Sequence, residues 1–261
     1  MADGSVIVVE IHSGRVTRCW NGRKECIRQS DNGPNGAAIG PDGALYVCYN
    51  GGENQANRPG SVERVDLTTG RSETVYDSCD GVPLSAPNDL VFDCDGNIWF
   101  TDLGRSSEHS KDFGALYCAT ADGRSITRIM GKAMSYNGVG LSPDMRTVYV
   151  SDTYQGRVYA FDRRCEVQMP RYLATAPATQ LLDSMAVTEN GNLCIATLMP
   201  GGVFVVSPDG QTHAQPFDDA YITNIAFGGP DMQSAWLTFC ERGLLVRTRW
   251  PEKGLRLTYN A

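Results

Sequence analysis

A repeated pattern along the whole chain constrains its fold more than any other feature of the sequence. Each repeat has a short apolar segment, a turn and a second apolar segment, and an Asn or Asp stands seven residues before the Asp or Asn of the turn. These key residues lie 53, 49, 46 and 41 positions apart. Repeats of about 40 to 50 residues are typical of propeller blades. The five pairs are Asn35 and Asp42, Asn88 and Asp95, Asn137 and Asp144, Asp183 and Asn190, and Asn224 and Asp231.

Each repeat predicts a set of antiparallel strands. Turns built on Asp-Gly or its like join the two apolar segments, and such turns favour β-hairpins. Another apolar segment follows, for example at 60–66, 114–117 and 156–161. About four strands per 45 residues is the spacing of a blade, and no long helical periodicity competes with it. We therefore predict an all-β chain in which residues 1–261 form a single domain, a six-bladed β-propeller.

The first blade is predicted to be incomplete at its N-terminal side. Residues 3–10 are interpreted as the turn and second strand of a sixth repeat. The seven-residue offset then places the key residue of that repeat before Met1, so the innermost strand is missing. Either the chain is a shortened form, or another segment such as 255–259 fills the position. The sequence leaves these alternatives open.

Charge and cysteine usage exclude several classes of protein. With 23 basic and 30 acidic residues the net charge is −7, which argues against non-specific nucleic-acid binding. No apolar run approaches the ~20 residues that a membrane span needs, and the first residues lack a signal-peptide pattern. The nine cysteines form no CxxC pair, so we expect all of them to be structural thiols. That usage favours a reducing compartment and a cytoplasmic location.

The key residues of the repeats predict one binding site. In a propeller the innermost strand of every blade begins at the same end of the central tunnel. Side chains at a fixed phase should therefore converge there, although a single Asn before a turn usually caps the local backbone. Four amide oxygens and one carboxylate would form an oxygen-only set, which suits Ca²⁺ or Mg²⁺. The set is Asn35, Asn88, Asn137, Asp183 and Asn224.

A second set of polar residues ends the second strand of each blade. Acidic residues at such positions commonly accept hydrogen bonds from turn amides, and we expect this structural role for Asp102 and Asp152 in particular. Glu10 is a candidate for substrate binding, because it lies in the blade whose key residue is missing. The set is Glu10, Asn50, Asp102, Asp152 and Thr197.

Two of the repeats carry a resemblance to a known family. Residues 85–89 with 99–102, and residues 136–144 with 150–153, resemble the gluconolactonase/regucalcin (senescence-marker-protein) family, and the resemblance covers essentially the whole chain. It implies a six-bladed propeller with a divalent metal in the tunnel, usually Ca²⁺, with Mg²⁺, Mn²⁺ or Zn²⁺ as alternatives. Family members hydrolyse lactones, and relatives hydrolyse organophosphate esters. By position, the implied metal ligands are Asn88, Asn137 and Asp183.

The chain departs from the family pattern at two points. The Glu-Gly-Pro motif that supplies the first-blade ligand is absent, and Ala86 stands where regucalcin-type members carry Arg. Among the implied ligands only Asp183 then has a formal charge. Because Ca²⁺ affinity depends partly on ligand charge, a lower affinity is expected. Glu10 is the alternative that would compensate.

These residues suggest metal-assisted hydrolysis of a lactone or related ester. A cation would polarise the carbonyl, and Asp183 would activate water or attack directly. Asn35 and Asn224 are expected to orient substrate or water. The polar segment 104–113, with Arg105 and His109, and the segment 51–59 are candidate rim loops or ordinary solvated loops. Tyr136 and Met185 are candidates for an apolar wall or for core packing.

Other functions remain open at the level of sequence. No GxSxG, HExxH or GxxxxGK[ST] motif supports a rival catalytic class. The main alternative is a non-catalytic or impaired propeller that binds a partner without its first-blade ligand, because fold alone does not determine function. A third alternative keeps the metal but catalyses isomerisation or another non-hydrolytic step. The expected partner is a small lactone or ester, with no nucleic acid or membrane; the specific substrate, the physiological metal and the oligomeric state remain open.

Overall fold

The structure is a computed structural model that describes residues 1, 3–52, 58–177 and 180–259. Every secondary-structure element assigned in these residues is a β-strand. The strands form six larger sheets and one two-stranded hairpin. None of the described residues belongs to a helix that is long and apolar enough to cross a membrane. The prediction of an all-β chain is confirmed.

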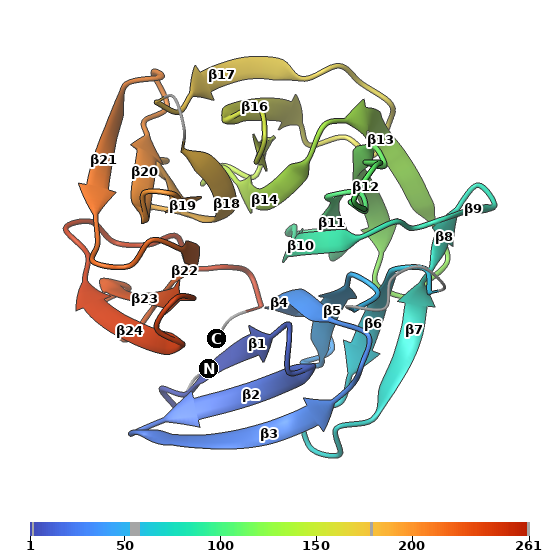
Figure 1. Cartoon of the computed structure of the whole chain (residues 1–261), viewed down its shortest axis with the longest axis horizontal. Helices are drawn as coiled ribbons and strands as arrows, with labels where there is room; N and C mark the ends of the chain where they lie inside the picture. Colours follow the sequence, from blue (N-terminus) through green and yellow to red (C-terminus); the bar gives the residue numbers. More distant parts are fainter. Residues whose placement is uncertain (2, 53–57, 178–179, 260–261) are drawn as a thin grey trace. The chain divides into compact units, whose positions relative to one another are not determined.

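The six larger sheets are the blades of a six-bladed β-propeller, as predicted (Figure 1). Strands within each sheet follow one another in chain order, and each pairs antiparallel with the next. The chain divides into two compact units, which are described separately. The first unit comprises residues 1–133, 165–167 and 257–261, and the second comprises residues 134–164 and 168–256.

The first unit holds three blades and the hairpin. Its first sheet contains β1 (Val6–Glu10), β2 (Arg15–Trp20) and β3 (Arg23–Gln29). The next contains β4 (Pro34–Ile39), β5 (Leu45–Tyr49), β6 (Ser61–Val65) and β7 (Ser72–Tyr76). The hairpin consists of β8 (Ser78–Cys79) and β9 (Val82–Pro83). The third blade contains β10 (Pro87–Phe92), β11 (Asn97–Asp102), β12 (Gly114–Thr120) and β13 (Ile126–Ala133).

The second unit holds the other three blades. One contains β14 (Tyr136–Leu141), β15 (Thr147–Asp152), β16 (Arg157–Asp162) and β17 (Arg171–Thr175). The next contains β18 (Leu181–Val187), β19 (Leu193–Leu198), β20 (Gly202–Val206) and β21 (Thr212–Pro216). The last contains β22 (Ile222–Gly228), β23 (Ser234–Phe239) and β24 (Leu244–Arg249).

The turns between the first two strands of each blade follow the predicted chemistry. Gly43 and Gly96 take left-handed backbone angles, with φ of 77° and 84°, which glycine adopts without steric cost. In the equivalent turn after β14, Met145 takes a φ of 56° instead. Asp42 accepts from the Ala44 N–H at 3.2 Å and Asp144 from the Arg146 N–H at 3.1 Å, whereas in the turn with Gly96 it is Asp93 that accepts, from the Asp95 and Asn97 N–H groups at 2.9 Å. An Asp that accepts backbone hydrogen bonds is thus common to these three turns, whereas the glycine is not.

The first blade has the predicted three strands. β1 lies at one edge of its sheet, and no strand among the described residues pairs with its other edge. Residues 255–259 do not form a strand, so the suggestion that this tail completes the blade is wrong. The Tyr259 ring instead packs edge-on against Phe92 in the first unit, with 5.8 Å between ring centroids. Aromatic packing rather than β-pairing holds this end of the chain.

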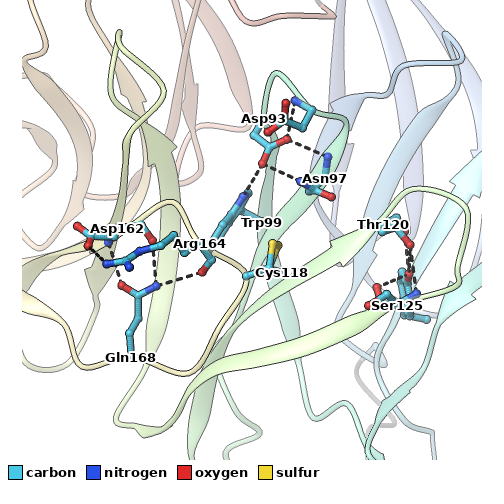
Figure 2. Close-up of a disulfide and its surroundings, with 12 residues drawn as sticks. Asp93, Asn97, Trp99, Cys118, Thr120, Ser125, Asp162, Arg164 and Gln168 are labelled. Carbon is cyan, nitrogen blue, oxygen red and sulfur yellow. Dashed lines mark hydrogen bonds and ion pairs between the residues drawn. A yellow bond between two sulfur atoms is a disulfide. The ribbon is translucent and has the colours of Figure 1, made fainter.

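One cysteine prediction is corrected by the structure. Cys118 on β12 and Cys165 in the β16–β17 connection form a disulfide, with 5.4 Å between their Cα atoms. The expectation that all nine cysteines are thiols is therefore wrong for these two; the other seven are free. Cys118 lies opposite Trp99 in the β11–β12 register, and the Trp99 indole donates to the buried Asp93 carboxylate at 3.0 Å (Figure 2). Cys118 is therefore buried, and the residue opposite it, Trp99, is hydrogen-bonded to Asp93.

Candidate functional site

The key residues of the repeats lie where the inner strands depart from regular pairing. The register shifts just after the first or second residue of each inner strand, and Asn35, Asn88, Asn137 and Asp183 fall inside these irregular steps. β-Bulges of this kind re-aim side chains, often next to active sites. The fifth residue differs, because Asn224 is back in register opposite Thr238. Four of the five side chains thus share a local geometry that the sequence phase alone does not reveal.

In the first unit, Asn35 and Asn88 lie on the neighbouring strands β4 and β10. A Cβ on Gly36 would come within 2.5 Å of the Asn88 carbonyl oxygen and of the Asp89 Cα, so the two backbones touch at this point. Asn88 is buried, and its Oδ1 receives no hydrogen bond from any residue that the structure describes. Such a buried carbonyl costs about 1–3 kcal/mol unless it finds a partner. It is the kind of donor atom that a bound cation would satisfy.

In the second unit, Asn137 and Asp183 are brought together in the same way. A Cβ on Gly138 would lie 2.7 Å from the Asp183 carbonyl oxygen. The fully buried Ser151 on β15 links the two strands: its Oγ accepts from the Gly138 N–H and donates to the Asp183 carbonyl, both at 2.8 Å. The backbones that carry these two side chains are therefore fixed relative to one another.

Gly138→Ala is expected to disturb this contact strongly. Its Cβ would meet backbone atoms of residues 183–185 at 2.7 to 2.9 Å, and backbone cannot move aside as a flexible side chain can. We expect a loss of about 2 to 3 kcal/mol in the free energy of unfolding, measured by urea denaturation. Gly131→Ala is the matched control, because its Cβ would meet only the flexible Arg128 side chain at 3.1 Å. Equal stability of the two variants would contradict the proposed backbone contact.

The side chains of the second-unit pair differ in their surroundings. Asn137 is 5% exposed, and its Nδ2 donates to Thr153 Oγ1 at 3.1 Å. Asp183 and Asn224 are half-buried. Asp183 is therefore the more exposed residue of this pair.

Asp102 and Asp152 have the structural role that was predicted. Asp102 is buried and accepts hydrogen bonds from the backbone N–H groups of Ser85, Ala86 and Gly104 at 2.7 to 2.8 Å. Burial raises the pKa of its carboxyl group, and the three N–H donors oppose that effect. Asp152 accepts from the Ser135 hydroxyl at 2.6 Å. Both carboxylates hold the connections that lead into the inner strands.

Two further candidates lie in local hydrogen-bonded settings of the first unit. Glu10 is half-buried at the end of β1 and accepts from Thr17 and Ser13 in its own hairpin. The Thr17 hydroxyl is the main cause that lowers the pKa of this carboxyl group. Arg105 donates from Nε to the Ser85 carbonyl at 3.0 Å, which attaches the 104–113 segment just before β10.

The remaining candidates are at opposite extremes of exposure. His109 is exposed on the 104–113 segment, with its ring 3.7 Å from the exposed Glu108 carboxylate. Tyr136 is 2% exposed, and its ring packs against Tyr159 and Phe161 with centroids 5.9 and 6.2 Å away. Burial raises the pKa of its phenol. Met185 also lies in a buried cluster. The other proposed rim segment, 51–59, includes residues 53–57, which lie outside the described residues.

The hydroxyl groups behind the inner strands were not predicted from the sequence. Ser151 and Thr153 flank Asp152, and Thr101 precedes Asp102, so the alternation of hydroxyl and acidic residues at the ends of the second strands is the signal that indicates them. Thr101 Oγ1 accepts from the Asp89 N–H at 3.2 Å.

A polar hollow of about 380 Å³ in the first unit was also not predicted from the sequence. That hollow is lined by Arg28, Ser30, Asp31, Asn32, Arg58, Pro59, Ser61, Glu63, Thr74 and Asp77.

The donor chemistry of the key residues is compatible with a hard cation. Within the described part of the chain, no group of three or more His, Cys, Asp or Glu side chains is placed to hold a metal ion. The key residues instead offer amide oxygens and one carboxylate. Ca²⁺ binds such oxygen donors, amide carbonyls included, and the buried Asn88 Oδ1 fits that role.

Comparison with known proteins adds an independent line of evidence. Residues 1–241 match the family model described as the SMP-30/Gluconolactonase/LRE-like region. The chain is 28% identical over 197 residues to a gluconolactonase of Zymomonas mobilis, a match that covers 69% of this chain and 52% of that protein. It is also 28% identical to a lactonohydrolase of Aspergillus oryzae, with 82% of this chain and 56% of that protein covered. The chain thus spans little more than half the length of these two relatives.

Solved structures agree on the fold. A gluconolactonase from Xanthomonas campestris superposes with a TM-score of 0.77 at 25% identity, over 91% of this chain and 80% of that one. A calcium-binding protein, regucalcin, from Agrobacterium tumefaciens gives a TM-score of 0.78 at 18% identity, over 98% of this chain and 91% of that one. At 18% identity the second likeness supports the propeller fold alone.

Proposed function

Because the chain belongs to the SMP-30/gluconolactonase/LRE-like family, we propose that it is a divalent-metal-dependent hydrolase of lactones or related esters. Relatives named gluconolactonase and lactonohydrolase support a lactonase-type reaction. The observation in this chain that carries the proposal is the fixed pair of Asn137 and Asp183, whose backbones are joined through Ser151. Through Ser151, the backbones of the residues next to an amide side chain and of the single carboxylate of the repeat set are linked, which supports the proposal.

We propose Asn88, Asn137 and Asp183 as the residues that hold the metal. Ca²⁺ is the expected ion, and Mg²⁺, Mn²⁺ and Zn²⁺ are the alternatives. Support comes from the hard oxygen donors and from the buried Asn88 Oδ1, which accepts no hydrogen bond from the described residues. When bound, such a cation would polarise the carbonyl of the substrate.

Asp183 is proposed as the catalytic residue. As a carboxylate it can take the proton of the attacking water, or it can attack the carbonyl carbon itself. Asp183 is half-buried, and Ser151 fixes its backbone. Asn35 and Asn224 are proposed to orient substrate or water. Glu10, Arg105, His109 and Tyr136 stay predictions for substrate contact, of which Tyr136 has its ring in the core.

The test is a calcium titration by calorimetry on the 261-residue chain, combined with a panel of lactones and esters. Binding of one ion, with hydrolysis that a chelator abolishes, is the expected result. Product analysis distinguishes hydrolysis from isomerisation. Absence of both binding and turnover would contradict the proposal.

One observation favours a second candidate function. The first-blade Glu-Gly-Pro motif is absent, and the other edge of β1 pairs with no strand among the described residues. A chain of this fold could serve as a non-catalytic binding protein, because fold alone does not determine function. Metal binding without turnover of any lactone in the panel would support this candidate instead.

A cytoplasmic location stays a prediction. It was based on cysteines that were expected to remain reduced. The Cys118–Cys165 disulfide removes that part of the argument, because disulfides persist mainly in oxidising compartments.

A further inference from the structure

We propose that Thr153 is a positioning residue that holds the Asn137 amide with its carbonyl oxygen available to a cation. This inference rests on the proposed function, because it concerns one of the three proposed metal ligands. The geometry that carries it lies entirely in the second unit. Thr153 follows β15 directly, is 6% exposed, and accepts from Asn137 Nδ2 at 3.1 Å.

An asparagine side chain has two ends of similar shape and opposite hydrogen-bonding character. Only the carbonyl oxygen can bind a cation, while the amino end carries two N–H donors. Asn137 is buried, so an amino end without an acceptor is costly. Thr153 supplies that acceptor at the amino end. In a flipped amide the Thr153 hydroxyl could donate to Oδ1, but Nδ2 would lose this acceptor. The orientation in which Oδ1 faces away from Thr153 is therefore the one that keeps the buried amino end hydrogen-bonded to Thr153.

The rest of the β15 end keeps the Thr153 hydroxyl in place. The Thr153 N–H donates to the Ser135 carbonyl at 3.0 Å. Two residues earlier, Ser151 joins the Gly138 N–H to the Asp183 carbonyl. Ser151 thus fixes the backbones of both proposed ligands, and Thr153 fixes the amide of one of them.

Comparison with the other blades indicates that the fold itself does not need this hydroxyl. Four residues make the same backbone hydrogen bond to the segment before the inner strand: Asn50 to Gly33, Leu103 to Ala86, Thr153 to Ser135 and Cys240 to Tyr221. Their side chains are an amide, an isobutyl group, a hydroxyl and a thiol. The backbone bond is common to these repeats, whereas the side chain varies. The backbone bond therefore does not explain the hydroxyl at 153, whereas the hydrogen bond to Asn137 gives it a role at the proposed site.

The test compares Ca²⁺ affinity, measured by calorimetry, in wild type, Thr153→Val and Thr153→Ser. Valine has nearly the shape of threonine but no acceptor for Asn137 Nδ2, whereas serine keeps the hydroxyl. Residues that orient metal ligands typically contribute 10- to 100-fold in affinity. We expect a loss of about 10- to 100-fold for Thr153→Val, and an affinity within about threefold of wild type for Thr153→Ser.

Controls separate positioning from folding. Leu103→Val changes the equivalent position of the preceding blade and should leave Ca²⁺ affinity unchanged. The metal-free melting temperature of Thr153→Val should fall by no more than about 10 °C, because the shape of the side chain is kept and only the acceptor for one buried N–H group is lost. If Thr153→Val does not fold, Thr153→Leu replaces it, since leucine occupies this position in the preceding blade.

The outcomes distinguish this inference from the proposed function. Equal Ca²⁺ affinity in wild type and Thr153→Val would overturn the positioning role and leave the metal site intact. A loss that Thr153→Ser does not recover would also overturn it, because the hydroxyl would then not be the cause. Absence of Ca²⁺ binding by wild type would overturn the proposed metal site and this inference together.

Discussion

Asp183→Asn is expected to reduce kcat/KM for the best lactone of the panel by about 10³-fold. Loss of a positioned general base typically costs 10² to 10⁴ in rate, and an amide can neither take a proton nor attack a carbonyl. The variant should fold normally, because asparagine occupies the equivalent position of other repeats. The measurement is steady-state hydrolysis at saturating Ca²⁺, with the melting temperature as a check on folding.

Saturating metal is needed because Asp183 has two proposed roles. It is the only charged residue among the proposed ligands, so its replacement should also weaken Ca²⁺ binding. Asp144→Asn is the matched control: Asp144 lies in an exposed turn, accepts from Ser142 and the Arg146 N–H, and should be replaceable without effect on rate. Full activity of Asp183→Asn with metal bound would exclude the catalytic role and leave only that of a ligand.

Cys165→Ser is expected to lower the free energy of unfolding of the oxidised protein by about 4 kcal/mol. The disulfide joins residues 47 positions apart, and a cross-link over a loop of that length restricts the unfolded chain by about this amount in the chain-entropy model. The corresponding fall in melting temperature is about 10 °C. Cys165 is the better residue to change because it is exposed, whereas Cys118 is buried.

Two controls make this experiment decisive. Cys94→Ser removes an exposed free thiol and should leave stability unchanged. A reductant should remove the difference between wild type and Cys165→Ser. Thiol titration of the unfolded wild type without reductant should count the seven free cysteines that the structure contains. A count of nine, with no effect of reductant, would show that the disulfide is not formed in solution.

Much of the fold could be predicted from the sequence because its signals are local. The Asp of each turn and the apolar segments on either side specify a hairpin within about 15 residues, as around Asp42 and Asp95. Repetition of that unit gave the blade number. The phase from Asp3 also placed a strand at residues 6–10, and β1 lies there at the edge of its sheet among the described residues, since counting residues needs no knowledge of distant contacts.

The candidate site was predictable in its residue types and less so in its geometry. The shared phase of Asn35, Asn88, Asn137 and Asp183 identified residues that lie in equivalent irregular steps of their strands. The same phase did not distinguish Asn224, which is back in regular register. A one-residue difference in a bulge depends on packing between strands, so a spacing rule cannot detect it.

Patterns a few residues long were enough to predict the all-β repeat, its blades and the residue types at the start of each inner strand. Which distant residues support them depends on how the chain packs in three dimensions. Ser151 reaches the Asp183 carbonyl across 32 positions, and Cys118 reaches Cys165 across 47. Many residues of similar type compete for such partners along the chain. The choice among them is made when the blades pack, since only then are buried donors, acceptors and sulfur atoms brought within bonding distance.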